Sequence, residues 1–232
     1  RAALGATDRM AHRGRDRRAR HRRRRSGEPT VTGRFIALEG VDGCGKSTQA
    51  ALLATALRDT GHRVVETREP GGTTLGEAVR GIVLGSGGDM SPVAEALLFA
   101  ASRAQHVALV IRPALTDGAW VVCDRFVDSS LAYQGAARGL GIDAVWAINA
   151  PALDGCLPDL AIVLDVPPAV ADARDTGPKD RIEVEGIELQ HAVVDGYREL
   201  AVRFPGRVTI VPGRGSVEQV HALVMGAVER LA

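Results

Sequence analysis

The 232-residue sequence predicts an α/β fold in which helices cover both faces of a five-stranded parallel sheet. Five short aliphatic runs alternate with amphipathic stretches from residue 34 onward. The runs are apolar at consecutive positions, which is typical of strands that are buried on both faces. A glycine-rich loop directly follows the first run, at the carboxyl edge where sheets of this kind bind ligands.

The individual elements follow from these patterns in chain order. The aliphatic runs have four to seven residues, and we expect strands at 34–39, 63–67, 120–123, 160–166 and 208–211. Between the runs lie stretches with helical patterning, and Ser91 before Pro92 is a typical helix start. We expect helices at 46–60, 74–84, 92–117, 143–153, 190–204 and 217–231.

The composition restricts the class of protein. Hydrophobic residues make up 45% of the chain and the mean hydropathy is +0.01, which suits one well-buried domain over residues 34–232. No apolar run approaches the roughly 20 residues needed to span a bilayer, so we expect no membrane association. Three cysteines, Cys44, Cys123 and Cys156, cannot all pair and lack the spacing of a metal site. We therefore expect a cytoplasmic protein.

The first 33 residues differ sharply from the rest. They carry eleven arginines against three acidic residues, a net charge of +8, whereas the remainder has 18 basic and 25 acidic residues, a net charge of −7. A segment with so few apolar residues cannot form a core, and we expect residues 1–33 to be a disordered tail. Its charge could attract nucleic acid, but a solvated arm explains the composition as well, and we do not expect nucleic-acid contact.

Residues 40–48 form the pattern G-x-x-x-x-G-K-S between the first strand and the first helix. Glycines let backbone N–H groups approach a phosphate, and the helix N-terminus adds partial positive charge. Lys46 supplies a mobile cation, and the Ser47 hydroxyl suits Mg²⁺. We expect the loop to bind a nucleoside triphosphate through Gly40, Val41, Asp42, Gly43, Cys44, Gly45, Lys46, Ser47 and Thr48.

Charged residues follow the other strands at the same edge of the sheet. Asp124, directly after the third strand, is placed to hold a Mg²⁺-bound water or a second phosphate, although with Arg125 it could form only a local ion pair. Arg68, Arg80 and Arg103 recur on the same rim, where any one of them could simply face solvent. Together these arginines indicate a second anion facing the triphosphate, and so a phosphoryl donor and a phosphorylated acceptor.

Five ordered blocks between residues 34 and 232 resemble the thymidylate kinase family: 38–48, 67–73, 97–103, 124–135 and 180–183. The combination of 68–73 with 124–134 is far more specific than the phosphate loop alone. The resemblance implies a three-layer P-loop kinase fold with a short lid at about 174–185. It also implies ATP and Mg²⁺ as cofactors, a homodimer, and phosphorylation of dTMP to dTDP in dTTP biosynthesis.

The resemblance further implies how the acceptor is held. Phe99 would stack on thymine, Arg103 would hydrogen-bond to its O4 atom and Ser130 would lie near the base edge. Tyr133 and Gln134 would form the wall beside the deoxyribose, where a ring disfavours a ribose hydroxyl. Without the resemblance, Phe99 and Tyr133 would be interpreted as ordinary core residues.

The acceptor phosphate and the reaction complete the implied site. Arg80 and Arg125 would clamp the dTMP phosphate, with Asp42 and Glu69 near the sugar and phosphate. Because the acceptor oxygen belongs to an ionised phosphate, no general base is needed, and the protein must mainly align two anions that repel each other. The catalytic work would fall to Lys46, Asp124 and arginines, with Mg²⁺ held by Ser47 and Asp124.

The lid departs from the family pattern. The phosphate loop has Gly43-Cys44 where some relatives carry an arginine, so the assisting arginine should come from the lid. There, Thr176 precedes the glycine where an arginine is common in this subtype. We expect Arg181 to assist transfer, with Arg174 as the second candidate, unless Arg181 merely pairs with a neighbouring glutamate.

Two other functions remain open at this point. A deoxyribonucleoside kinase, or another nucleoside monophosphate kinase, would share the phosphate loop and lid, but a nucleoside acceptor needs a carboxylate base and no phosphate clamp. A non-catalytic nucleotide-binding switch would use the loop without an acceptor cleft. Turnover of ATP that depends on dTMP would distinguish all three.

Overall fold

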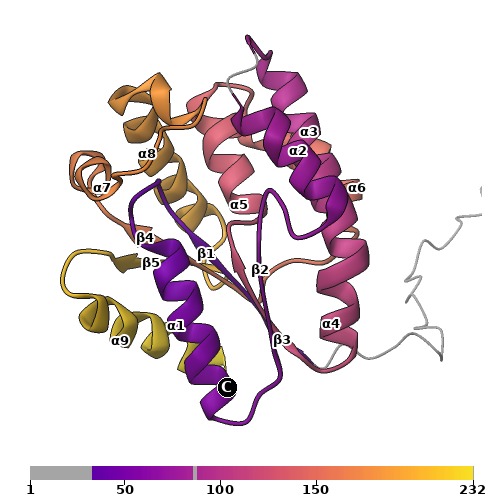
Figure 1. The fold of residues 1–232 in the computed structure, drawn as a ribbon, viewed down its shortest axis with the longest axis vertical. Coiled ribbons are helices and arrows are strands. Elements are labelled where there is room, and N and C mark those ends of the chain that lie inside the picture. The colour runs from indigo at the N-terminus through magenta and orange to yellow at the C-terminus, as the bar shows by residue number, and fades with distance from the viewer. Residues whose placement is uncertain (1–32, 86–87, 232) are drawn as a thin grey trace, which may run out of the picture.

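The computed structural model describes residues 33–85 and 88–231, so the predicted tail lies outside the described residues except for Gly33. It contains one parallel sheet in the order β2-β3-β1-β4-β5 (Figure 1). Each strand lies within one residue of its expected bounds. The strands are β1 (Phe35–Glu39), β2 (Val64–Arg68), β3 (Trp120–Asp124), β4 (Leu160–Asp165) and β5 (Val208–Pro212).

The six expected helices are present with small differences at their ends. The helix expected at 92–117 is continuous but changes its winding along its length. The six are α1 (Lys46–Asp59), α2 (Thr74–Leu84), α3 (Pro92–His106) continuing through the π-helical η1 (Val107–Ile111) into α4 (Arg112–Thr116), α6 (Ile142–Leu153), α8 (Ile187–Arg203), and α9 (Val217–Val228) with the 3-10 turn η4 (Glu229–Leu231).

Three helical segments were not expected. They are short or irregular, and two of them follow strands at the ligand-binding edge. These are α5 (Val127–Ser130) with the π-helical η2 (Leu131–Ala137) after β3, α7 (Pro168–Arg174) after β4, and the 3-10 turn η3 (Glu183–Glu185) before α8. Two serines and one glycine in the first and paired prolines in the second weaken the helical pattern in the sequence.

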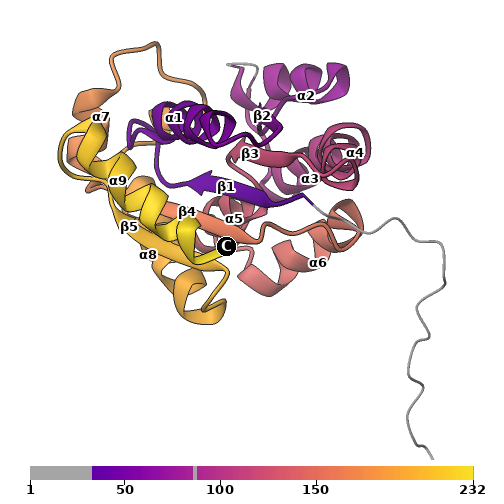
Figure 2. The ribbon, with the colours of Figure 1, turned by 90° about the horizontal axis from the view of Figure 1, so that it is seen from below.

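Helices cover both faces of the sheet, as predicted. Figure 2 shows α1 and α9 on one face and α6 and α8 on the other, where α8 also packs on η2. The central strand β1 is buried along its whole length, and Ile36 lies between Val122 of β3 and Leu160 of β4. The core therefore fixes the position of β1, and with it the loop at its carboxyl end.

The long helix Pro92–Thr116 bears on the expectation that no segment of the chain spans a membrane. Its 25 residues, with a window of mean hydropathy 1.2, are long and apolar enough to cross a membrane by length and composition. However, α3 packs against α2 and α6, and three of its buried residues are Glu95, Arg103 and His106. The core helices of globular proteins pass the same test of length and composition.

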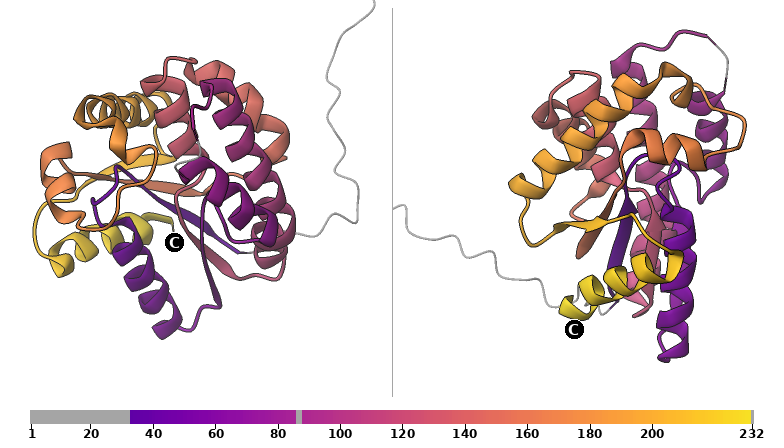
Figure 3. Two further views of the ribbon diagram at one scale, coloured as in Figure 1. Left: turned by 45° about the horizontal axis from the view of Figure 1, so that its top comes forward. Right: turned by 90° about the vertical axis from the view of Figure 1, so that its left-hand side faces the viewer.

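The carboxyl ends of the strands gather the predicted functional segments. β1 lies between β3 and β4 in the sheet, so the loops after these strands face one another at the point where the strand order reverses. Figure 3 shows α7 and the segment after it at the same end of the molecule as the N-terminus of α1. This end of the sheet holds the candidate site.

Candidate active site

The phosphate loop leaves β1 and enters α1 through three glycines with positive φ. Gly40 and Gly43 have φ of 134° and 73°, and a Cβ on Gly43 would lie 2.1 Å from the carbonyl oxygen of Ala171. Gly45, at φ 99°, precedes the first residue of α1. A side chain at Gly43 would therefore force the loop away from α7, and the loop geometry depends on glycine at this position.

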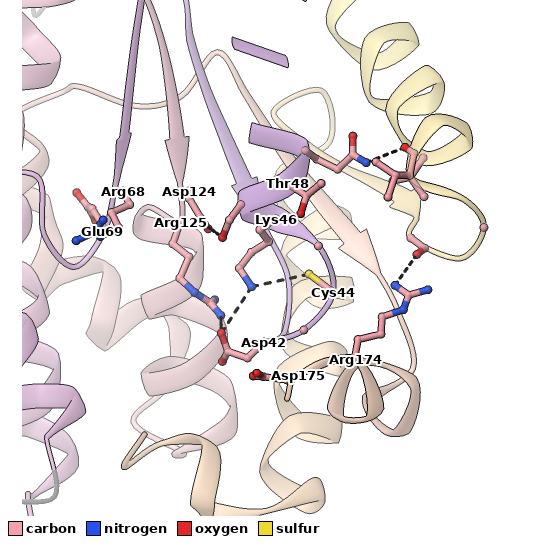
Figure 4. A pocket seen from close by; sticks show the side chains of 18 of the residues that line it. Asp42, Cys44, Lys46, Thr48, Arg68, Glu69, Asp124, Arg125, Arg174 and Asp175 are labelled. Atoms are coloured by element: carbon pink, nitrogen blue, oxygen red, sulfur yellow. Dashed lines mark hydrogen bonds and ion pairs between the residues drawn. The ribbon is translucent and has the colours of Figure 1, made fainter. Parts of the chain in front are cut away.

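Lys46 is held over this loop rather than extended into solvent. Its side chain is only 6% exposed, and Nζ donates to the carbonyl oxygen of Val41 at 2.7 Å. Nζ also lies 3.7 Å from a carboxylate oxygen of Asp42 and 3.8 Å from Sγ of Cys44 (Figure 4). The loop therefore presents a fixed positive charge at the N-terminus of α1, where an anion is favoured.

Ser47 and Asp124 form an arrangement at the loop that suits a divalent cation. Ser47 Oγ donates to Oδ2 of Asp124 at 2.5 Å, and within the described residues Oδ1 of Asp124 is buried without a hydrogen-bond partner. Among those residues, no group of three or more His, Cys, Asp or Glu side chains could hold a metal. One carboxylate and one hydroxyl fit Mg²⁺, which keeps several of its own waters.

Arg125 lies at the centre of the site and has an unusual backbone. It adopts φ of 69°, which is rare for a residue with a Cβ. Its guanidinium donates to the Gly40 carbonyl at 2.9 Å, to Ser129 Oγ at 3.1 Å and to Asp42 at 2.5 Å. These partners hold the strained backbone in place and aim the guanidinium at the phosphate loop.

Asp42 lies between Lys46 of the phosphate loop and Arg125 of the segment after β3, and it contacts both. Burial raises the pKa of its carboxyl, but the charges of Arg125 and Lys46 and a hydrogen bond from Tyr133 outweigh this and hold that pKa well below its usual range. Asp42 is therefore ionised at neutral pH. Figure 4 shows Lys46 and Arg125 both pointing toward it, so without a bound anion this carboxylate balances both cations.

Two cavities adjoin at these residues. The first, of about 700 Å³, runs along the phosphate loop past Ser47, Asp124 and Arg174. The second lies between α3, α5 and the segment before α8. They share the lining residues Asp42, Glu69, Arg80 and Arg125. Two anions bound in these cavities would meet at the shared wall, which contains two arginines.

The second cavity brings together every residue that the sequence predicts for the acceptor. Phe99 is partly buried against the core, and Tyr133 is 6% exposed with its hydroxyl 3.2 Å from Asp42. Arg80 donates to the carbonyl oxygen of Pro70 at 3.2 Å. The predicted acceptor residues that line the cavity are Asp42, Glu69, Arg80, Phe99, Arg103, Arg125, Ser130, Tyr133 and Gln134.

Arg103 and Glu69 are buried and paired with each other, which the sequence does not indicate. Arg103 is 1% exposed and donates to Glu69 at 2.9 Å, to Ser130 at 3.2 Å and to Asn149. Glu69 also accepts from Nδ1 of His106 at 2.9 Å, if that nitrogen carries the proton. The carboxylate of Glu69 is therefore occupied by a buried network that orients Arg103.

The two lid arginines occupy different places. Arg174, at the end of α7, lines the first cavity and donates to the Gly213 carbonyl at 3.2 Å (Figure 4). Arg181 lies away from the phosphate loop: Nε donates to the Val83 carbonyl at 2.9 Å, and Nη2 pairs with Glu95. The structure thus brings the second candidate, and not the first, to the phosphate loop.

A second buried carboxyl group, that of Glu39, lies next to the phosphate loop at the end of β1. Glu39, at the end of β1, is fully buried and accepts from the Phe126 N–H at 2.8 Å, Ser129 Oγ at 2.5 Å and the Tyr197 hydroxyl at 3.0 Å. Burial, assisted by the charge of Asp128, raises the pKa of Glu39 to about 7. Ser129 also accepts a hydrogen bond from Arg125. Through Ser129, the Glu39 carboxyl therefore helps to hold the Arg125 guanidinium in place.

Several lining residues were not predicted. The loop after β5 lines the first cavity, and this position at the carboxyl end of a strand was the signal that could have found it. Asn149 of α6 lines neither of the two cavities but supports Arg103, and a lone asparagine in an amphipathic stretch gives no such signal. The other lining residues that were not predicted include Gly213, Gly215, Ser216 and Val217 in the first cavity and Pro70, Leu84, Asp180, Ile182 and Glu183 in the second.

Comparisons with known proteins agree with this geometry. Residues 38–224 match the family model described as thymidylate kinase. The chain is 46% identical over 200 residues to the thymidylate kinase of Caldanaerobacter subterraneus, covering 86% of this chain and 96% of that protein. It is 48% identical over 205 residues to that of Pelotomaculum thermopropionicum, covering 87% and 95%. A crystal structure of thymidylate kinase from Ehrlichia chaffeensis superposes with a TM-score of 0.71 at 33% identity, covering 85% of this chain and 98% of that one.

Proposed function

The chain belongs to the thymidylate kinase family, and on that premise we propose that its two adjoining cavities bind ATP and dTMP. The protein is a kinase that phosphorylates dTMP to dTDP. One observation supports this assignment of the cavities above all: the cavity along the phosphate loop and the second cavity share a wall that contains Arg80 and Arg125. A phosphate entering from each side would meet these guanidinium groups.

ATP would lie in the first cavity with its phosphates on the loop. The backbone N–H groups of residues 43–48 and the charge of Lys46 suit the β- and γ-phosphates. Mg²⁺ would be held by Ser47 and Asp124, whose Oδ1 atom is buried and has no hydrogen-bond partner in the described part of the chain. The chemistry that Mg²⁺ would supply at Ser47 and Asp124 is neutralisation of the phosphate charge.

dTMP would lie in the second cavity. Phe99 offers a ring for base stacking, and Arg103 and Ser130 line the wall where the base edge would lie. The guanidinium nitrogens of Arg103 already donate within the buried network, so Arg103 would meet the base only if one of these hydrogen bonds were exchanged. Tyr133 is fixed by Asp42 and would stand beside the deoxyribose, with Gln134 behind it. Arg125 and Arg80 would hold the 5′-phosphate at the wall shared with the ATP cavity.

The protein's own part in the reaction is to align the two phosphates and to neutralise their charge. On arrival of the two nucleotides, Lys46 and Arg125 would exchange the Asp42 carboxylate for phosphate oxygens. Asp42, which those two cations keep ionised in the structure, would then be available to accept a hydrogen bond from a hydroxyl group. Because Arg174 lines the ATP cavity and Arg181 does not, we propose Arg174 as the lid arginine that assists transfer.

Two further features of the chain, its exposed apolar side chains and its unpaired cysteines, bear on its oligomeric state and its compartment. Large apolar side chains are exposed along α2, α3 and η1, namely Leu75, Ile82, Val93, Leu97 and Leu109, and we propose that this surface pairs two copies in a homodimer. All three cysteines are unpaired, which suits a reducing compartment such as the cytoplasm.

Product analysis by ³¹P NMR tests the function directly. With ATP, Mg²⁺ and dTMP, we expect signals of dTDP and ADP in equal amounts, and Lys46→Ala should abolish both. Arg63→Ala is the matched control, since Arg63 forms an exposed pair with Asp117 near the amino end of β2. Formation of ADP without dTDP, or no product with the wild type, would contradict the proposal.

A further inference from the structure

The segment between α7 and α8 forms one wall of the proposed acceptor cavity. Asp180, Ile182 and Glu183 line this cavity together with Gln134 of η2. A local turn shapes the segment, because Asp180 Oδ1 accepts from the backbone N–H groups of Ile182 and Glu183. Such a turn does not hold the segment against the rest of the protein, so its docking depends on longer-range contacts.

Arg181 makes these longer-range contacts. Its neighbours Asp180 and Ile182 line the cavity, whereas its own guanidinium pairs with Glu95 of α3 and donates to the carbonyl of Val83. Its backbone N–H donates to the carbonyl of Leu84 at 3.1 Å. Arg181 thus attaches the wall of the cavity to α2 and α3.

Glu95 contacts two further side chains besides that of Arg181. The residue is 0% exposed and accepts from Arg138 at 2.5 Å and from the Gln134 amide at 2.8 Å in addition to Arg181. Arg138 in turn forms a two-pronged pair with Glu185 at 2.6 and 2.8 Å. One buried carboxylate therefore holds Gln134 on one wall of the cavity and the lid on the other.

We propose that Glu95 is the latch that docks residues 180–185 over the acceptor cavity, and that Arg181 is its partner on the lid. Glu95 is a positioning residue in this account, because it lies behind the cavity lining and acts through Arg181, Arg138 and Gln134. The proposal rests on the assignment of the second cavity to dTMP. It also gives Arg181 a structural task instead of contact with the transferred phosphoryl group.

We expect the lid to undock when the negative charge of Glu95 is removed, because the Arg181 guanidinium then loses its carboxylate partner. Replacing Glu95 by glutamine keeps the shape of the side chain but leaves Arg181 without a carboxylate at hydrogen-bond distance, since Glu185 is 3.8 Å away. A guanidinium that is only 14% exposed is costly to leave unpaired, and it can regain solvation by moving outward with the lid. Arg138 keeps Glu185 as its partner, so the rest of the cluster remains neutralised.

Hydrogen–deuterium exchange of the full chain without nucleotides tests the latch independently of activity. In Glu95→Gln, we expect the peptide that contains the Arg181 amide to exchange about tenfold faster or more, and a β1 peptide to be unchanged. Glu188→Gln, an exposed carboxylate on α8, is the matched control and should exchange like the wild type. Unchanged exchange around Arg181 in a folded Glu95→Gln protein would overturn the proposal.

Kinetics of the same variants separate the latch from a role in transfer. Glu95→Gln and Arg181→Ala should each raise the KM for dTMP about tenfold with a smaller change in kcat, and the double variant should be no worse than either single one. Arg181→Ala also covers the case in which Glu95→Gln does not fold, because Glu95 then still pairs with Arg138. A thousandfold loss of kcat in Arg181→Ala that Glu95→Gln does not reproduce would overturn the proposal. A wild type without dTMP kinase activity would instead refute the proposed function and leave the exchange test intact.

Discussion

Ser47 Oγ donates to Asp124 Oδ2 at 2.5 Å and thereby joins the start of α1 to the end of β3, while Oδ1 of the same carboxylate stays buried without a partner within the described residues. A hydroxyl oxygen and a carboxyl oxygen are thus fixed side by side at the phosphate loop. Buried carboxylate oxygens are ordinarily hydrogen-bonded, so an orphaned one needs a cation or water. This relationship is the basis for assigning the Mg²⁺ site.

Asp124→Asn should weaken the response to Mg²⁺. The amide keeps the shape but loses the charge, so we expect the Mg²⁺ concentration for half-maximal ADP release to rise by about 10- to 100-fold. The matched control is Asp117→Asn, because Asp117 is 70% exposed at the opposite end of β3. Equal Mg²⁺ dependence in wild type and Asp124→Asn would show that Asp124 does not hold the ion.

Arg125→Lys should damage acceptor binding although it keeps the charge. A lysine cannot contact Gly40, Ser129 and Asp42 together as the planar guanidinium does, and so cannot be held at the shared wall. Loss of one or two charge-assisted hydrogen bonds predicts a fall in kcat/KM for dTMP of about 10- to 100-fold, with the KM for ATP little changed. Initial rates over a dTMP series at saturating ATP would measure this, and an unchanged kcat/KM would remove Arg125 from the clamp.

Arg174→Ala should lower kcat more than it raises either KM. Arg174 lines the ATP cavity beside the phosphate loop, and an arginine that stabilises a transferring phosphoryl group contributes roughly a thousandfold in related enzymes. Single-turnover rates at saturating dTMP and ATP would isolate this step. If Arg174→Ala only raises the KM for ATP, the residue binds the nucleotide and does not assist transfer.

Glu39→Gln should change how stability depends on pH. The pKa of Glu39 is raised from 4.5 to about 7, so between these values the carboxyl is ionised in the unfolded chain and protonated in the folded one. Raising the pH through this window therefore destabilises the wild type, by at most about 1.4 kcal/mol per pH unit. Glutamine cannot titrate, so the variant should gain stability relative to the wild type as the pH rises from 4.5 to 7. Urea unfolding at several pH values would measure the difference, and a constant difference would contradict the raised pKa.

The sequence was sufficient to predict the sheet and the long helices because their signals are local. Consecutive aliphatic residues marked all five strands, and Ser91-Pro92 marked the start of α3, where the Ser91 side chain accepts from the Ala94 N–H. The segment 127–137 was missed because its winding depends on packing against α8, which no local pattern reveals. The same holds for α7, whose seven residues are too few to show a helical period.

The site was predictable in its membership but not in its contacts. The rule that ligands bind at strand carboxyl ends, joined to the family motifs, named residues that line both cavities. It could not show that Arg103 is buried in a network with Glu69, Ser130 and Asn149, or that Arg181 turns toward Glu95. Those contacts join residues far apart in sequence, and long arginine side chains can reach partners in several directions.

The most direct test of the central claim is a coupled ADP-release assay that offers dTMP, dUMP, dCMP and thymidine separately with ATP and Mg²⁺. Thymidine differs from dTMP only by the phosphate that Arg80 and Arg125 are proposed to hold, so the pair tests the clamp, while the other two nucleotides test the base. We predict a clear preference for dTMP and no turnover of thymidine. Turnover of thymidine equal to that of dTMP, or no turnover of any acceptor, would contradict the account.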